Sequence, residues 1–280
     1  MTILIGVPTY DDTVKAAACG LLLSESRQPH CPPYTVAFKT ASLLAYAHNA
    51  LLCIALNNRP EITHLLIWHA DVIPQPGFLA VLWEEMVRSQ ADVLGTVLAI
   101  KDGKGLTSTA LLPDVTGEAD PVGRREFRRQ RLTLKEAASL PPTFDALDLQ
   151  RVFEDQSTSP TLLVNTGLLL IDVRKPWIER CWFEINDAIF KRDDGLWYAD
   201  VEPEDWHFSR LAAAAGARVC ATQKVMAAHV GRANFPNTGA WGEWSHDLAG
   251  KPLDHDTTGD SHEEIDLSEP VRQPASQPAL

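Results

Sequence analysis

Short apolar runs alternate with stretches of helical periodicity along the first hundred residues. Four runs have the length of strands: 2–7, 34–38, the run that starts at His64, and 92–100. Three stretches between them place apolar residues at helical spacing: 13–24, 42–57 and 76–88. Asp12 or Thr13 is expected to cap the first of these helices. Strands that alternate with helices predict an α/β fold, with a mostly parallel central sheet flanked by helices on both faces.

The pattern weakens between residues 101 and 160, which we interpret as an insertion or loop region within the domain. Five arginines crowd one short part of it: Arg124, Arg125, Arg128, Arg129 and Arg131. A short helix with a solvated basic face explains this run most simply. The alternative is a lid or acceptor contact for an anionic substrate.

Regular patterns return at residue 161. The stretch 161–173 is strand-like on both sides of Asn165-Thr166-Gly167, and a glycine inside a strand indicates a bulge or a close approach of the backbone to a ligand. A helix is predicted over 176–190. A second helix is predicted to open with Glu202-Pro203-Glu204-Asp205-Trp206, to run to Ala215 and to end at Gly216. Two last strands are expected at 217–221 and 225–229.

The C-terminal segment differs in composition from the rest of the chain. Seven acidic residues and no lysine or arginine lie between Leu253 and Glu269, and Pro, Ser and Gln follow. A segment with few apolar groups and one sign of charge is expected to be solvated and disordered. We therefore predict one domain over 1–247 and a disordered acidic tail over 248–280.

Composition excludes several classes of protein. The formal net charge of −12 argues against binding of nucleic acid by the whole surface. No apolar run reaches the length of a membrane span, and the N-terminus lacks the basic region of a signal peptide. The five cysteines are scattered and odd in number, which is typical of reduced thiols in a cytoplasmic protein. A cytoplasmic globular protein is expected.

The stretch His64 to Pro76 carries the first candidate chemistry. It runs through apolar residues, turns polar at His69 and Asp71, and ends in a proline turn. In an extended chain His69 and Asp71 point to the same side, at the strand end where open α/β sheets bind ligands. A carboxylate there is able to hold a divalent cation and, through it, a diphosphate. A strand end closed by an aspartate before a proline turn is the equally weighted alternative.

The order of motifs along residues 2 to 235 resembles that of a GT-A glycosyltransferase, the Rossmann-like type with a DxD motif. Pro8, Thr9, Tyr10 and Asp11 resemble the loop that receives the nucleoside. His48-Asn49 resembles an Arg-Asn pair, and His69-Ala70-Asp71 resembles the DxD motif. Later in the chain the resemblance rests on Asn165-Thr166-Gly167, on Glu204-Asp205 and on His229.

The resemblance implies a sugar transferase that uses a nucleotide-sugar donor. The residues expected at the donor are Pro8, Thr9, Tyr10, Asp11, His48, Asn49, His69, Asp71 and Gly167. Mn²⁺ or Mg²⁺ is expected between Asp71 and His229. Asp205, with Glu204 as second choice, is expected to be the general base of an inverting transfer, and the helix dipole is expected to lower its pKa.

Two alternatives stay open at this point. One is a retaining transferase of the same fold, which needs no base at Asp205. The other is a catalytically silent sugar-nucleotide-binding or scaffold protein, favoured by His69 in place of the first aspartate of the motif. The acceptor is open between a glycan, a lipid-linked sugar, a protein and a modified nucleic-acid base.

Overall fold

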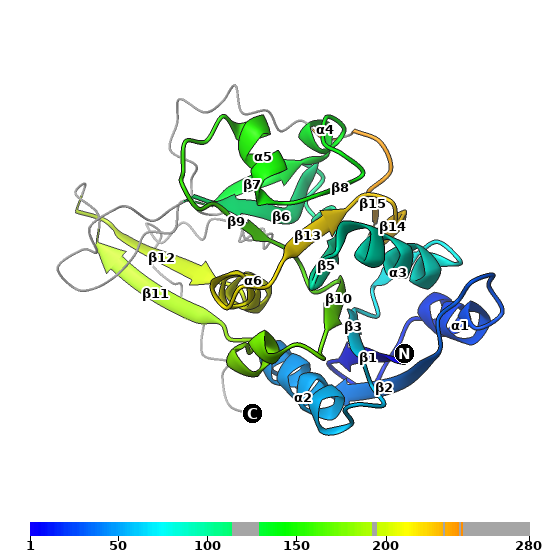
Figure 1. The fold of residues 1–280 in the computed structure, drawn as a ribbon. Coiled ribbons are helices and arrows are strands. Elements are labelled where there is room, and N and C mark those ends of the chain that lie inside the picture. Colours follow the sequence, from blue (N-terminus) through cyan, green and yellow to red (C-terminus); the bar gives the residue numbers. More distant parts are fainter. Residues whose placement is uncertain (114–128, 192–194, 232, 241, 243–280) are drawn as a thin grey trace, which may run out of the picture.

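A computed structural model gives the fold and describes residues 1–113, 129–191, 195–231, 233–240 and 242. Its centre is a sheet of seven strands in the order β2-β1-β3-β10-β5-β13-β8 (Figure 1). The bounds of these strands are β1 (Ile3–Thr9), β2 (Tyr34–Thr40), β3 (His64–Trp68), β5 (Val93–Thr96), β8 (Thr143–Phe144), β10 (Leu168–Asp172) and β13 (Val219–Thr222). The predicted fold class, α/β, is confirmed.

Five of these seven strands run in one direction. β2 and β3 are parallel to β1, and β13 is parallel to β5. β10 is antiparallel to both of its neighbours, β3 and β5, and β8 is antiparallel to β13. The sheet is therefore mixed, with a parallel majority as predicted.

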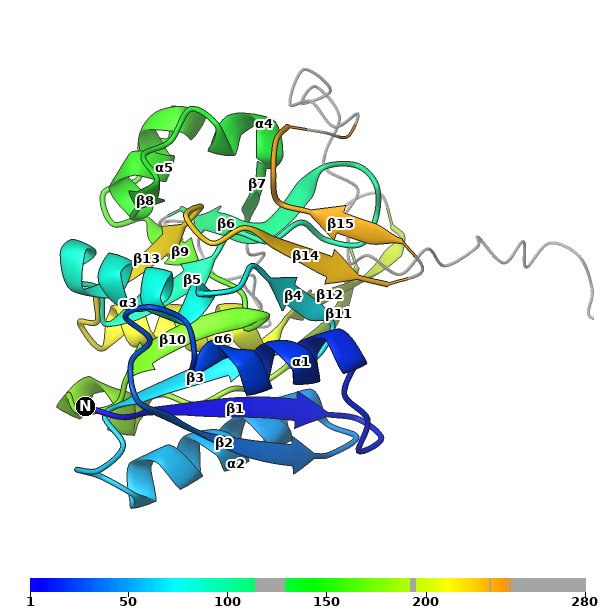
Figure 2. The same ribbon diagram turned by 90° about the vertical axis from the view of Figure 1, so that its right-hand side faces the viewer.

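Alternate strand residues point to opposite faces of the sheet, and both faces carry apolar residues. Helices therefore cover both faces. On one face α2 (Leu44–Asn57) and α6 (Glu204–Ala214) pack on a cluster that includes Leu4 and Leu65. On the other face α1 (Ala16–Glu25) and α3 (Phe78–Ser89) pack on one that includes Ile3, Ile5 and Leu66. Figures 1 and 2 show α2 on one side of β1 and β3, and α1 on the other.

Three smaller sheets surround the central one. They are β11 (Asn186–Lys191) with β12 (Trp197–Glu202), the sheet β15 (Asn234–Pro236)–β14 (Ala227–Val230)–β4 (Val72–Pro74), and the sheet β7 (Gln130–Thr133)–β6 (Leu106–Leu112)–β9 (Thr161–Leu163). Short helices α4 (Leu134–Ala137) and α5 (Ala146–Phe153) and the 3₁₀ helix η1 (Pro176–Arg180) complete the described elements. The described part of 101–160 thus holds regular structure, and its β8 joins the central sheet.

Two predicted helix positions are corrected. The stretch 176–190 forms only η1 and then the start of β11. The reason is tertiary: Asn49 accepts a hydrogen bond from the Phe183 backbone N–H at 2.8 Å and donates one to its carbonyl at 2.7 Å. The first helix begins at Ala16 without a side-chain cap. Asp12 instead accepts a hydrogen bond from Thr40.

None of the helices in the described ranges is long and apolar enough to cross a membrane. The predicted boundary at Asp247 and the predicted tail over 248–280 lie outside the described residues.

Candidate functional site

The predicted site residues near Asp71 and His229 meet at the carboxyl edge of the parallel strands. β3 ends at Trp68, a turn covers 69–71, and β4 begins at Val72. Because His229 on β14 is opposite Val72 in the ladder, the Asp71 turn lies beside the end of β14. Figure 2 shows the arrowheads of β1 and β2 on the same side of the molecule as β4 and β14. His69 and Asp71 thus share a tight turn, and the predicted extended chain at these two residues is wrong.

Asp71 is held by two nitrogen groups. His229 Nε2 lies 3.5 Å from Asp71 Oδ2, and the Lys101 ammonium donates a hydrogen bond to the same oxygen. The other ring nitrogen of His229 lies 3.1 Å from the carbonyl oxygen of Ala99. Burial alone raises the pKa of Asp71, but hydrogen bonds from His229 and Lys101 outweigh it and hold that pKa well below its ordinary value. The carboxylate is ionised at neutral pH.

These residues do not fit a divalent cation while Lys101 stays in place. No group of three His, Cys, Asp or Glu side chains able to hold a metal occurs in the described part of the chain. The oxygen that faces His229 already accepts from the Lys101 ammonium. An ammonium and a divalent cation about 4 Å apart repel by about 8 kcal/mol at an effective dielectric constant near 20. Binding of Mn²⁺ or Mg²⁺ by Asp71 and His229 stays a prediction, and Lys101 counts against it.

His48, which is buried, and His69, which is half-buried, form an imidazole pair. Their Nε2 atoms lie 3.1 Å apart and their rings stack with centroids 5.3 Å apart. Burial lowers the pKa of His48 well below its ordinary value, and burial lowers that of His69 to about 4. Both rings are therefore neutral at pH 7, and one donates its Nε2 proton to the other.

The imidazole pair lies next to Glu204, the first residue of α6. His48 Nδ1 lies 3.9 Å from Glu204 Oε1 and has no hydrogen-bond partner within the described residues. Glu204 is itself buried, 8% exposed. Glu204, His48 and His69 thus form a line of titratable groups that ends two residues from Asp71.

Asp205 sits beside this line, and its ionisation differs from the prediction. Burial and the neighbouring Glu204 carboxylate raise the pKa of Asp205 well above its ordinary value, although the Trp206 backbone N–H and the Arg131 guanidinium oppose the shift. Burial therefore outweighs the helix-dipole effect that predicted a lowered pKa. A carboxylate with a raised pKa is a stronger base once it is ionised.

Arg131 corrects the prediction for the arginine-rich segment. It lies on strand β7, and its guanidinium is 4.5 Å from the centre of the Trp206 ring. It is not on a solvated helix face, and burial lowers its pKa. Arg129 lies just before β7, 5.2 Å from the centre of the same ring. The segment that holds the other three arginines lies outside the described residues.

Two of the predicted donor-binding residues have structural partners. Both polar ends of the Asn49 side chain are bonded to the Phe183 backbone, as described above. Gly167 donates its backbone N–H to Asn165 Oδ1 at 3.0 Å, and Asn165 Nδ2 bonds the Thr96 carbonyl at 2.7 Å. A Cβ on Gly167 would lie 2.6 Å from Leu98 Cδ1, so side-chain packing accounts for this glycine.

Gly167→Ala is expected to destabilise the protein by about 1–3 kcal/mol, since the new methyl group overpacks the space against Leu98. Thermal melting should show a drop of roughly 2–4 °C per kcal/mol for a domain of this size. Gly20→Ala is the matched control: a Cβ there meets nothing within 4 Å, and it lies inside α1. That control should gain stability. Equal gains in both variants would contradict the packing role.

The predicted nucleoside loop is partly exposed and is tied to the site through Lys15. Tyr10 is 76% exposed, and Asp11 accepts from the Thr13 hydroxyl at 2.5 Å. The Thr9 hydroxyl lies 2.7 Å from that of Thr40. Lys15 Nζ donates to the Val230 carbonyl at 2.9 Å, next to His229. Pro8 is buried at the end of β1.

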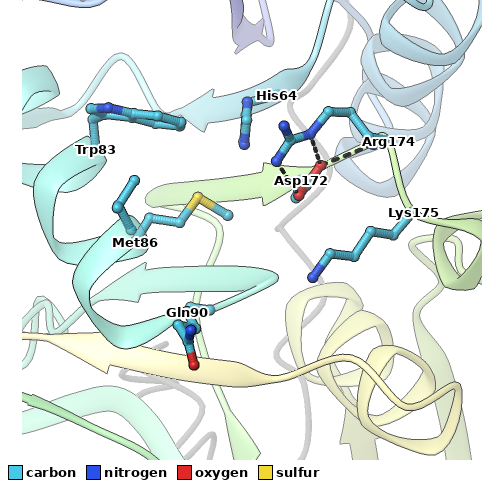
Figure 3. Close-up of a pocket in the computed structure, with 9 residues that line it drawn as sticks. His64, Trp83, Met86, Gln90, Asp172, Arg174 and Lys175 are labelled. Atoms are coloured by element: carbon cyan, nitrogen blue, oxygen red, sulfur yellow. Dashed lines mark hydrogen bonds and ion pairs between the residues drawn. The ribbon is translucent and has the colours of Figure 1, made fainter. Parts of the chain in front are cut away.

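A cavity of about 170 Å³, drawn in Figure 3, lies at the opposite end of β3 from the Asp71 turn. Its lining includes His64 at the start of β3 and Asp172 at the end of β10. Its charged groups are paired: Arg174 Nη2 lies 2.7 Å from Asp172, and Lys175 bonds Asp92. We therefore assign it a structural role.

The comparisons with known proteins leave the activity open. No family model matches the chain, and no curated protein matches it. Among solved structures, the crystal structure of A197 from STIV matches with a TM-score of 0.46 and 13% sequence identity, over 88% of this chain and 99% of that one. Values this low support no conclusion about function.

Proposed function

We propose that this chain is a glycosyltransferase that moves a sugar from a nucleoside-diphosphate sugar to a hydroxyl acceptor. The observation that carries the proposal is the group of side chains at the carboxyl edge of the sheet. The group joins residues from five parts of the chain through hydrogen bonds and ion-pair contacts: His48, His69 with Asp71, Lys101, Glu204 and His229. Open α/β sheets bind ligands at this edge.

The chemistry of sugar transfer needs two kinds of group, and this edge holds both. The departing nucleoside diphosphate gains negative charge, which nearby cationic groups stabilise. We assign this role to Lys101, whose ammonium bonds Asp71 beside His229. The incoming hydroxyl loses a proton, and Asp205 is the carboxylate proposed to take it in an inverting displacement. The acceptor is a hydroxyl compound that reaches α6, and screening of candidate acceptors identifies it.

A thermal-shift panel of nucleotide sugars tests the proposal. A ligand at 100 times its dissociation constant stabilises the folded state by about 2.7 kcal/mol. At roughly 2–4 °C per kcal/mol, that raises the melting temperature by about 5–10 °C. Free sugars and nucleoside monophosphates are the controls, because they lack the diphosphate. If no nucleotide sugar in the panel shifts the melting temperature, the proposal fails.

A catalytically silent sugar-nucleotide-binding protein is the second candidate, and the pairing of Asp71 with Lys101 favours it. Binding alone does not separate the two. Release of nucleoside diphosphate from the bound donor, followed over time, indicates a transferase, and its absence with every acceptor indicates a binding protein. The anomeric configuration of the product, measured by NMR, then separates inverting from retaining transfer.

A further inference from the structure

We infer that Lys101 takes the position of the metal ion, and that the site binds a diphosphate without a divalent cation. The inference deepens the proposed function, because it names the Lys101 ammonium as the positive charge that balances the diphosphate. It depends on that function only for the source of the diphosphate.

The Lys101 side chain is held in place along its length. Its ammonium donates to Asp71 Oδ2, and its side chain is 34% exposed. Its aliphatic part lies against Gly231, where an added Cβ would be 3.2 Å from Lys101 Cδ. Gly231 thus leaves the space through which the stem reaches Asp71. A fixed ammonium loses less side-chain entropy when it binds an anion than a mobile one does.

A second ammonium, that of Lys15, contacts the end of β14 as well. Lys15 Nζ bonds the Val230 carbonyl at 2.9 Å, while Val230 N–H donates to the Asp71 carbonyl at 2.7 Å. An ammonium carries three N–H donors, and these contacts take one from each lysine. Lys15 and Lys101 therefore bring two ammonium groups to Val230 and Gly231, next to His229.

The sum of charges favours an anion over a metal ion. The two lysines and Asp71 together leave one net positive charge. A divalent cation would add to that charge, and a diphosphate would offset it. Asp71 then serves to orient Lys101 and does not act as a metal ligand.

Two variants distinguish binding of the diphosphate by Lys101 from binding through a metal ion held by Asp71. Lys101→Met removes the ammonium and keeps the stem, so diphosphate binding should weaken at least tenfold. Asp71→Asn keeps Lys101, so binding should survive or strengthen. If Asp71 held a metal that binds the diphosphate, Asp71→Asn would abolish binding instead. Lys104→Met, an exposed lysine in the same loop, is the control with the same change of charge.

We measure binding of inorganic pyrophosphate to the full chain by calorimetric titration, once in EDTA and once in Mn²⁺. We expect wild type and Lys104→Met to bind in EDTA. The inference is overturned by binding that needs Mn²⁺, by unchanged binding in Lys101→Met, by loss in Asp71→Asn, or by no binding in either buffer. Because no sugar is present, lysine-dependent pyrophosphate binding stands even if every nucleotide sugar fails to shift the melting temperature.

Discussion

Glu25→Ala is expected to lower the free energy of unfolding by about 3 kcal/mol or more. Glu25 is the last residue of α1 and is 0% exposed. Its carboxylate accepts hydrogen bonds from the backbone N–H groups of Gly77 at 3.0 Å and Leu79 at 2.9 Å. N–H groups at the start of a helix have no partner within the helix itself. Gly77, the N-cap of α3, has no side chain to accept from them, so Glu25 takes that role. Each hydrogen bond to a charged group contributes about 1.5–3 kcal/mol.

Urea denaturation measures this loss as a lower midpoint at unchanged slope. Glu25→Gln keeps one carbonyl oxygen to accept a bond, so its loss should be smaller than that of the alanine variant. Glu84→Ala, an exposed glutamate on α3, is the matched control and should change stability by less than about 0.5 kcal/mol. If Glu25→Ala is as stable as Glu84→Ala, the capping role is wrong.

The alternation of strands and helices was predictable because its signal is local. Periodicity located β1, β2, β3, α2 and α3 close to their observed bounds. The direction of β10 was not predictable, since an antiparallel strand and a parallel one have the same apolar pattern when both faces are buried. The non-helical chain at Phe183 is held by Asn49, 134 residues earlier, and no local pattern encodes such a contact.

The candidate site also has features that the sequence predicted and features that it did not. The resemblance placed Asp71 and His229 together, and the structure brings them within 3.5 Å. Lys101 was missed because it is an ordinary lysine after a strand, with nothing in the sequence that marks its distant partner. Arg131 was assigned to a helix because charge density suggested a surface, yet it is half-buried on strand β7 and packs on the Trp206 ring. Partners that are distant in sequence decided each of these cases.

Asp205→Asn is expected to remove the proposed base at little cost to the fold. The pKa of Asp205 is raised in the folded protein by burial and by Glu204, so the folded state binds the proton more tightly than the unfolded one. As the pH rises above the pKa that Asp205 has in the unfolded chain, the free energy of unfolding falls, because the folded protein disfavours the ionised carboxylate. The fall is complete once the pH exceeds the pKa that Asp205 has in the folded protein. A neutral amide removes the penalty. The variant should melt no lower than wild type at pH 8, and relatively lower at pH 4.

The same variant is expected to lower kcat by roughly 10²-fold or more on a confirmed donor and acceptor. The wild-type rate should fall with decreasing pH through a pKa above the ordinary range of aspartate, and Asp205→Asn should lose that dependence. Glu204→Gln is the matched neighbour, and its rate should fall less, since in this assignment Glu204 acts only through its charge. A loss confined to Glu204→Gln would move the base to Glu204, which reaches the Asp71 turn through His48 and His69. Near-wild-type rates in both variants would exclude an inverting base on α6 and favour the retaining mechanism.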